Sequence, residues 1–315
     1  MSLDRDAFYI DGGWRAPASD ATLRVVSPHS EEVIATVPEA SVGDVDAAVA
    51  AARKAFDEGP WPRMTPAERI AVIEAFSGLY AAKLTEMAEL ISLEMGSPTS
   101  FSQLAQSPAP WMQIESFLAI AREFPWEAAR PGSLGSDVVV RHEPVGVVAA
   151  IPPWNVPQFT VMSKVVPALL AGCTVVVKPA PESPLDCYLM AELLHEAGVP
   201  AGAVNIVAGG REVGQHLVAH PGVDKVAFTG STAAGRQIGA TCGEQLKRVS
   251  LELGGKSAAI VLEDADLDEV VQGAIFGAFG NTGQICMHIE RMYLPRSRYE
   301  EFKAKFVRAA EALDV

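Results

Sequence analysis

Apolar residues along this chain follow two different periods. From Ile70 to Ile91 they recur every three or four positions, which predicts one amphipathic helix. The segment Thr65-Pro66-Ala67-Glu68 has the form of a capping box with proline at the first helical position, and it marks where this helix begins. A strand and turn over Phe8–Trp14 and an Ala-rich helix over Asp44–Phe56 are predicted before it.

Beyond Pro144, short apolar strands alternate with amphipathic helices. The predicted strands are Val147–Ile151, Thr174–Lys178, Val204–Val207, Lys225–Phe228, Arg248–Leu253 and Ala258–Leu262. One of the intervening helices is predicted to begin after an N-cap at Ser183 and to end at Gly198. Nearly continuous apolar strands separated by helices predict an α/β fold with a parallel sheet that is covered on both faces.

The composition is that of an ordinary globular protein with an acidic balance. Of its 315 residues 49% are apolar and 20% are charged, and this length favours two domains or one large domain. The net charge of −14, without any basic stripe, argues against a nucleic-acid partner. No apolar run reaches the roughly 20 residues that span a bilayer, and Met1–Asp6 lacks a basic targeting pattern. We therefore expect no membrane partner and a cytoplasmic location.

Cysteine and histidine spacing indicates neither disulfides nor a metal site. The four cysteines are scattered without a Cys-x-x-Cys pair, so reduced thiols are expected. Glycines and polar residues precede Cys286, which favours an accessible loop, whereas Cys173, Cys187 and Cys242 are expected to pack inside. The histidines form no metal-binding motif and are interpreted as surface or structural residues, among them His195, His216, His220 and His288.

Three side chains at predicted strand ends and in loops suggest covalent catalysis on a carbonyl carbon. Cys286, in Gly283-Gln284-Ile285-Cys286, offers a thiol nucleophile, and Glu252, in Leu251-Glu252-Leu253-Gly254-Gly255, offers a carboxylate base. Asn155 lies between prolines after a predicted strand and is suited to donate a hydrogen bond to an oxyanion. A rigid turn without catalytic function is the alternative reading of the Asn155 segment.

Two further segments suit a nucleotide. Lys178 closes a predicted strand before Pro179, where open α/β sheets bind ligands, so it is suited to donate to a ribose hydroxyl; a solvated lysine is the alternative. The segment Phe228-Thr229-Gly230-Ser231 leads from a strand into a helix whose first amides can bind phosphate. Simple helix capping, with Gly235 serving helix packing, explains that segment equally well.

Taken together, these motifs resemble the aldehyde dehydrogenase superfamily. The resemblance covers the chain from about Phe8 to Val315 and rests on five segments in family order. They are Pro153-Trp154-Asn155, Lys178-Pro179-Ala180, Phe228-Thr229-Gly230-Ser231-Thr232-x-x-Gly235, Glu252-Leu253-Gly254-Gly255-Lys256 and Gly283-Gln284-x-Cys286.

The resemblance implies a role for each matched residue. It makes Cys286 the nucleophile, Glu252 the general base, Asn155 the oxyanion donor and Lys164 a lysine placed near Glu252. The implied cofactor contacts are Pro153, Trp154, Lys178, Pro179, Glu182, Gly210, Gly214, Phe228, Thr229, Gly230, Ser231, Gly235, Leu253 and Gly254. The implied reaction oxidises a small-molecule aldehyde through a cysteine thiohemiacetal and a thioester, which water activated by Glu252 then hydrolyses to the acid.

Three departures from the family pattern limit what the resemblance implies. Pro181 stands where a ribose-binding glutamate is usual, and Glu182 follows it; NAD is expected because no extra basic residue accompanies Lys178, and NADP stays open. His288 and Glu290, after Cys286, either line the site entrance or begin a half-buried strand. The chain also ends within the family's catalytic domain.

The resemblance divides the chain into a Rossmann-like, doubly wound cofactor domain over 1–125 and 144–252, an inserted oligomerisation hairpin over 126–143, and the start of a second α/β catalytic domain over 253–315. It implies a homo-oligomer, a dimer or a tetramer. A shortened chain that only binds nucleotide, or only associates with full-length subunits, is the alternative function, and esterase-like thiol chemistry is a milder one. Small residues at Val156, Thr160 and Ser163 suggest an open tunnel for a bulky or extended aldehyde.

Overall fold

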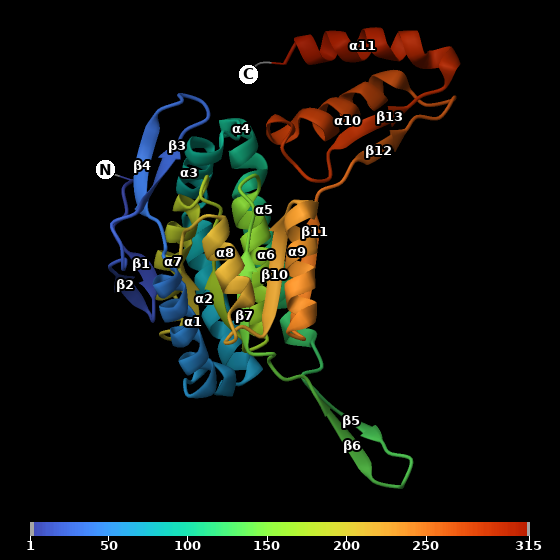
Figure 1. Ribbon diagram of the computed structural model, residues 1–315. Coiled ribbons are helices and arrows are strands. Elements are labelled where there is room, and N and C mark those ends of the chain that lie inside the picture. The colour runs from blue at the N-terminus through green and yellow to red at the C-terminus, as the bar shows by residue number, and fades with distance from the viewer. Residues whose placement is uncertain (1–2, 314–315) are drawn as a thin grey trace.

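A seven-stranded sheet forms the centre of the computed structural model, which describes residues 3–313 (Figure 1). Residues 1–2 and 314–315, at the ends of the predicted cofactor and catalytic domains, lie outside the described residues. The strand order is β11-β10-β7-β8-β9-β1-β2. The strands are β1 (Phe8–Ile10), β2 (Gly13–Arg15), β7 (Val147–Ile151), β8 (Thr174–Val177), β9 (Val204–Ile206), β10 (Lys225–Gly230) and β11 (Arg248–Leu253).

Five of these strands run parallel, from β11 to β9, and the hairpin β1–β2 joins β9 in the antiparallel sense. The chain starts the parallel part of this sheet at β7, adds β8 and β9 on one side, and then returns to add β10 and β11 on the other. The winding direction therefore reverses beside β7. A reversal of this kind opens a crevice outside the carboxyl ends of the strands, which is where open α/β sheets bind ligands.

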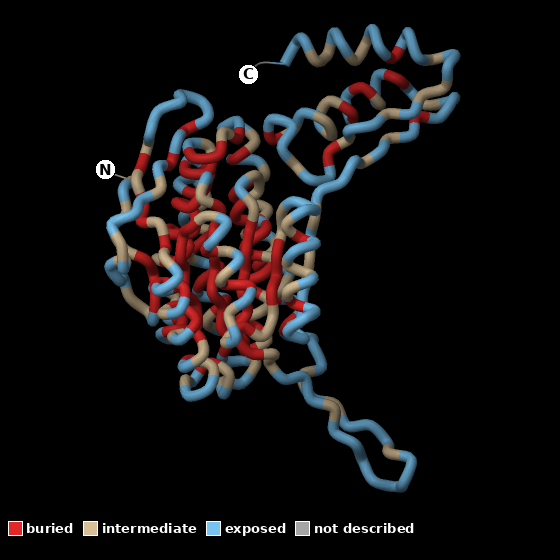
Figure 2. Tube along the Cα trace, in the orientation of Figure 1, coloured by how far each residue is buried: buried red, intermediate tan, exposed pale blue. Residues whose placement is uncertain are grey.

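Helices cover both faces of the sheet, so the predicted doubly wound α/β class is confirmed. On one face lie α1 (Val42–Asp57), α8 (Arg211–Ala219) and α9 (Thr232–Glu244). On the other lie α6 (Pro157–Leu170) and α7 (Leu185–Glu196), backed by α2 (Pro66–Ala82), α3 (Leu84–Met95) and α5 (Pro108–Glu123). Figure 2 shows the buried residues concentrated in these layers, and β7 and β8 are buried along their whole length.

The single helix predicted from Ile70 to Ile91 is wrong, because the chain breaks at Lys83. Lys83 has φ −111° and ψ 11°, so α2 ends there and α3 begins at the next residue. The hydroxyl of Ser107 donates to the Leu84 carbonyl at 2.7 Å and ties the start of α3 to the residue before α5. The apolar period continues through the break, and no glycine or proline marks it, so periodicity alone does not reveal two helices.

Ser183 does not cap α7, contrary to the sequence prediction. Its hydroxyl donates instead to the Trp154 carbonyl at 3.3 Å. The cap comes from α3, where the buried Glu94 carboxylate accepts from the backbone amides of Leu185 and Asp186 at 2.8 and 3.0 Å. A carboxylate placed 91 residues earlier in the chain thus satisfies the first amides of α7, which is a tertiary contact that a local capping pattern cannot predict.

Three smaller parts extend from the main body. The hairpins β3–β4 (Thr22–Val26 and Val33–Pro38) and β5–β6 (Glu127–Pro131 and Asp137–Arg141) are antiparallel, and β5–β6 projects into solvent (Figures 1 and 2). The parallel pair β12–β13 (Ser257–Ile260 and Ile289–Tyr293) packs with α10 (Leu267–Phe279) and α11 (Tyr299–Glu311) around a second small core. Glu290 lies in β13, so the strand reading of this residue is confirmed.

Short helical turns complete the fold. They are η1 (Trp61–Arg63), α4 (Thr99–Phe101), the π-helical turn η2 (Ser102–Gln106), η3 (Gly280–Gly283) and η4 (Arg296–Arg298). Apolar side chains of β12 and α10 are exposed in this chain: Ile260 by 74% and Phe276 by 63%.

The buried carboxyl pair of Glu94 and Asp186 makes stability depend on pH. Burial raises the pKa of Asp186 to about 7, and burial with the neighbouring Asp186 raises that of Glu94, so the folded pair keeps a proton that the unfolded chain has lost. The folded state then binds more protons, and stability falls as pH rises from about 4 to about 7. We expect Asp186→Asn to flatten this slope in urea unfolding measured at several pH values. The exposed acid Glu196 on the same helix supplies the matched control, Glu196→Gln, which should keep the wild-type slope.

Candidate active site

The carboxyl ends of the parallel strands bring the predicted motif residues to one edge of the sheet. Asn155 follows β7, Lys178 follows β8, Gly210 follows β9, Ser231 follows β10, and Glu252 lies near the end of β11. Parallel strands end on the same side, so segments up to about 100 residues apart in sequence share this edge. The fold therefore brings together the predicted site residues that precede β12.

A cavity of about 740 Å³ opens at this edge and runs along α6. Lys164, Thr229, Glu252 and Cys286 all line it. The remaining lining is largely apolar and includes Phe101, Val156, Phe159, Phe276 and Met287. The thiol and the carboxylate singled out in the sequence thus face the same space, and the sequence did not predict the aromatic lining.

Glu252 lies beside Thr229 across the β10–β11 ladder, where their Cα atoms are register partners. Partners in register point to the same face of a sheet. On that face the ammonium group of Lys164, from α6, donates to the Thr229 hydroxyl at 2.6 Å and to the Thr160 carbonyl at 3.2 Å. Burial lowers the pKa of Lys164 to about 8, and the nearby charge of Glu252 acts against that shift.

Cys286 is exposed, whereas Cys173, Cys187 and Cys242 are buried, and all four thiols are free, as the sequence predicts. The turn Ile285–His288 presents Cys286, since the His288 amide donates to the Ile285 carbonyl at 3.1 Å. The preceding residues Asn281, Thr282 and Gly283 have φ of 50°, 54° and 74°, three consecutive left-handed conformations. This unusual run sends the chain back toward the end of β7.

Asn155 is held against the Cys286 loop. Its side-chain amide donates to the Gln284 carbonyl at 2.6 Å, and its own carbonyl accepts from Gln106 and Asn281, each at 3.0 Å. The first of these bonds fixes which end of the amide is nitrogen and uses one of its two N–H groups. Gln106 and Asn281 were not singled out as site residues from the sequence, because both are polar residues in irregular segments without a motif of their own.

The residues predicted to contact a cofactor lie at the same edge. Lys178 is buried, and its ammonium donates to the carbonyls of Pro179 and Gly209 at 2.7 and 2.8 Å. Burial lowers its pKa to about 8, although Glu182 acts in the opposite direction. Gly214 lies beside the Lys178 side chain, at 3.5 Å from the position that a Cβ atom would take.

Two of the predicted glycines have a clear packing reason. A Cβ atom at Gly235 would come within 2.5 Å of the Leu253 side chain, and one at Gly230 within 2.5 Å of the Phe228 ring. Ser231 is the N-cap of α9, where its hydroxyl accepts from the Ala234 amide at 3.2 Å. The remaining predicted contacts, Pro153, Trp154 and Gly254, lie in the loops that follow β7 and β11.

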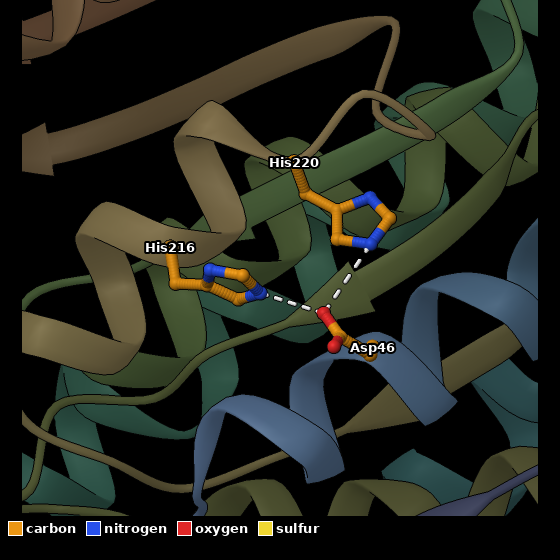
Figure 3. A group of neighbouring side chains, drawn as sticks. All are labelled: Asp46, His216 and His220. Atoms are coloured by element: carbon orange, nitrogen blue, oxygen red, sulfur yellow. Dashed lines mark hydrogen bonds and ion pairs between the residues drawn. The ribbon is translucent and has the colours of Figure 1, made fainter.

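Two histidines on the surface contact a shared aspartate. His216 and His220, one helical turn apart in and just after α8, meet Asp46 of α1 (Figure 3). Their Nε2 atoms lie 2.6 and 3.4 Å from Asp46 Oδ1. The sequence does not reveal this group, because Asp46 comes from another helix, and the contacts agree with the interpretation of both histidines as surface or structural residues.

The hydrogen bonding of His220 fits a neutral ring that donates toward Asp46 better than a metal ligand. The Gly222 amide donates to His220 Nδ1 at 3.0 Å, so the neutral ring carries its proton on Nε2, facing Asp46. Metal-binding histidines instead donate from the nitrogen that does not hold the metal. Metal binding through Nε2 would therefore require this ring to give up its backbone contact.

Comparison with known proteins identifies the class that this fold and this site define. The family model described as "Aldehyde dehydrogenase family" matches residues 14–315, and the chain belongs to that family. Within the family, it is 41% identical over 315 residues to the geranial dehydrogenase of Castellaniella defragrans, and the match covers 100% of this chain and 66% of that protein.

Solved structures of relatives have the same fold. An aldehyde dehydrogenase of Mycobacterium tuberculosis in complex with NAD+ superposes with a TM-score of 0.96 at 42% identity, over 99% of this chain and 65% of that one. A mutant of aldehyde dehydrogenase C from Pseudomonas syringae, in complex with NAD+ and octanal, superposes with a TM-score of 0.93 at 40% identity, over 98% and 62%. The chain spans about 62 to 66% of the length of these relatives.

No helix among residues 3–313 is long and apolar enough to cross a membrane.

The contact between Lys164 and Thr229 can be tested without any substrate. Thr229→Val keeps the side-chain volume but removes the hydroxyl that accepts from the buried ammonium. Because a hydrogen bond to the charged form favours that form, we expect the pKa of Lys164 to fall below its present value of about 8. NMR titration of the protein after reductive methylation with ¹³C-formaldehyde measures this pKa. Thr241→Val, at a partly exposed position of α9, is the control, and an unchanged Lys164 titration in Thr229→Val would contradict the contact.

Proposed function

We propose that this protein oxidises an aldehyde to the carboxylic acid with NAD+, through a thioester on Cys286. The observation that carries the proposal is the shared cavity of Cys286 and Glu252 at the carboxyl edge of a doubly wound sheet, in a chain of the aldehyde dehydrogenase family. A thiolate and a carboxylate facing one space can act in sequence on the same carbon atom. The apolar lining excludes water from much of that space, which strengthens electrostatic contacts within it.

The residues at the sheet edge fit a dinucleotide. Lys178 uses two of its three N–H groups on backbone carbonyls and retains one for a ribose hydroxyl. The first amides of α9, after Ser231, point toward the edge and suit a pyrophosphate. When bound there, NAD+ supplies the hydride acceptor. The NAD+ complexes of two relatives support NAD, and no basic residue directly beside Lys178 offers a partner to the 2′-phosphate of NADP.

The chemical steps divide among four side chains. The Cys286 thiolate attacks the aldehyde carbon, and the oxyanion that forms accepts from the second N–H of Asn155. Loss of hydride from that carbon leaves an acyl thioester on Cys286. Glu252 then takes a proton from water, the water oxygen attacks the thioester carbon, and the acid departs as the thiolate is restored. The ammonium of Lys164, near Glu252, stabilises the carboxylate that must accept this proton.

Glu252→Gln separates the two halves of this reaction. The variant retains the nucleophile but cannot accept the proton of water, so acylation should proceed and hydrolysis should stall. We expect a burst of about one NADH per active site, followed by turnover reduced at least about 10²-fold. Rapid-mixing absorbance of NADH measures both phases.

Cys286→Ala is the control for the burst, because without the thiol neither phase should appear although NAD+ still binds. Titration of intrinsic fluorescence with NAD+ checks that binding. A Cys286→Ala protein that still oxidises aldehyde at a substantial rate would disprove the proposed function. A Glu252→Gln protein with normal steady turnover would disprove the role of Glu252 alone.

We propose an extended or bulky aldehyde as the substrate. Val156, Thr160 and Ser163 line the cavity with modest side chains, while Phe159 and Phe276 add apolar surface. One relative is described as a geranial dehydrogenase, and the structure of another is a complex with octanal, so both are associated with aldehydes of this kind. The width and the apolar lining of the cavity support this class of substrate.

Kinetics with a series of straight-chain aldehydes tests the substrate class. Each added methylene that the cavity buries contributes about 0.8 kcal/mol, or roughly fourfold in kcat/KM. We expect kcat/KM to rise from acetaldehyde to octanal. Thr160→Phe should reverse the trend by filling the tunnel, whereas Thr241→Phe on the surface should leave it unchanged. A preference for acetaldehyde in the wild-type protein would contradict the open tunnel.

The division of the chain remains part of this proposal. We assign 1–125 and 144–252 to cofactor binding, 126–143 to subunit association, and 253–315 to the start of the catalytic domain. The projecting β5–β6 hairpin exposes Val138 and Val139 by 51% and 59%, which suits contact with another copy of the chain. We therefore propose that copies of the chain form a homo-oligomer through this hairpin.

A further inference from the structure

Gln106 lies behind the oxyanion donor, in a position that neither the proposed chemistry nor any motif accounts for. It belongs to the π-helical turn η2, and its side chain is only 2% exposed. Its Nε2 group donates to the Asn155 carbonyl at 3.0 Å and to Asn281 Oδ1 at 2.9 Å. One amide nitrogen thus contacts both the segment that carries Asn155 and the loop that leads to Cys286.

Asn281 continues the network toward the nucleophile. Its Nδ2 group donates to the Asn155 carbonyl at 3.0 Å and to the Gln284 carbonyl at 3.3 Å. The Gln284 amide donates back to the Asn281 carbonyl at 2.9 Å. Asn155 Nδ2 completes the ring by donating to the same Gln284 carbonyl. Four amides from three parts of the chain therefore determine where Asn155 stands relative to the turn of Cys286.

The donors and acceptors in this ring allow only one orientation for each side-chain amide. Gln106 faces two acceptors, so its nitrogen must point inward. Asn281 accepts from Gln106 on its oxygen, and its nitrogen is therefore directed at the two carbonyls. Asn155 consequently keeps its nitrogen toward Gln284, with its second N–H left for an oxyanion. Reversing the Gln106 amide would place oxygen against oxygen at two contacts.

Contacts within its turn and with α3 fix the position of Gln106. The π turn is closed by the Ser107 amide, which donates to the Ser102 carbonyl at 3.1 Å, and the Ser102 and Ser92 hydroxyls meet at 2.8 Å. Gln106 Nε2 also lies 3.6 Å from Met95 Sδ of α3. Insertions of this π type are common at functional sites because they re-aim side chains. Gln106 Oε1 is buried without a donor among the described residues, a cost that packing alone does not explain.

We propose that Gln106 is a positioning residue for carbonyl attack: it orients the Asn155 amide toward the oxyanion and, through Asn281, holds the Cys286 turn beside it. The inference rests on the proposed function, because it assumes that Cys286 attacks a carbonyl carbon. It requires no contact between Gln106 and the reacting atoms. A variant that lacks Gln106 should therefore lose oxyanion stabilisation and keep the reactivity of the Cys286 thiol.

Two reactions of Cys286 distinguish these losses. With p-nitrophenyl acetate, the thiolate attacks the ester carbon, the oxyanion collapses, p-nitrophenolate leaves and an acetyl thioester forms. With iodoacetamide, the thiolate displaces iodide from an sp³ carbon and no oxyanion arises. We expect Gln106→Met to slow the p-nitrophenolate burst at least about tenfold, with alkylation changed less than about threefold. Stopped-flow absorbance and intact-mass labelling measure the two rates.

Two further variants control for folding. Gln106→Glu keeps the volume and exchanges the donor for an acceptor, so it should show the same selective loss near neutral pH. Gln103→Met, on the exposed side of the same turn, should leave both rates unchanged. Equal losses in acylation and alkylation for both Gln106 variants would show a merely structural role and overturn the proposal.

A double-mutant cycle tests whether Gln106 acts through Asn155. In an Asn155→Ala background the oriented amide is already absent, so Gln106→Met should lower the acylation rate by less than about threefold further. An undiminished loss in that background would overturn the proposal. The ester reaction needs no cofactor, so the result is independent of aldehyde oxidation. A wild-type protein that reacts with the ester but reduces no NAD+ would refute the proposed function and leave the role of Gln106 measurable.

Discussion

The parallel arrangement of β7 to β11 is the constraint on which the site depends. Because these strands all end on one side, the loops after them meet at one edge, and the reversal of winding beside β7 leaves a crevice there. Asn155, Lys178 and Ser231 each need only to follow a strand in order to share that edge, and Glu252 lies near the end of its strand. The parallel strands therefore position the polar chemistry by where they end.

Two buried lysines place ammonium groups at this edge of the sheet. Lys164 and Lys178 both have pKa values lowered to about 8 by burial, although the protein as a whole carries a net charge of −14. Each ammonium is paired with carbonyl or hydroxyl oxygens and not directly with a carboxylate. Such a group loses little when a polar ligand arrives, because no salt bridge must first be broken. Local donors, and not the overall charge, make this edge suitable for an anionic nucleotide.

Sequence reasoning predicts the parts of this protein that depend on local pattern. The strands at Val147 and Thr174 agree with the structure because each is a short, almost entirely apolar run whose residues are all buried. The helix break at Lys83 was not predictable because no glycine or proline marks it, and the cap supplied by Glu94 was not predictable because it comes from a distant part of the chain. The same distinction holds in the site, where the glycines before Cys286 predict a loop. The role of Gln106 cannot be recognised in the sequence, because it arises only when three loops meet.

The loop before Cys286 shows why such distant partners matter. Asn281 and Thr282 adopt φ of 50° and 54°, and for the β-branched threonine this conformation is costly, of the order of 1–3 kcal/mol. Residues remain in such conformations only where surrounding contacts over-determine them. Here those contacts are the amides of Gln106 and Asn155, which satisfy Asn281 and Gln284. The network therefore holds a strained turn in place, and the strain keeps Cys286 at the tip of the turn, where a thiol can reach a substrate carbon.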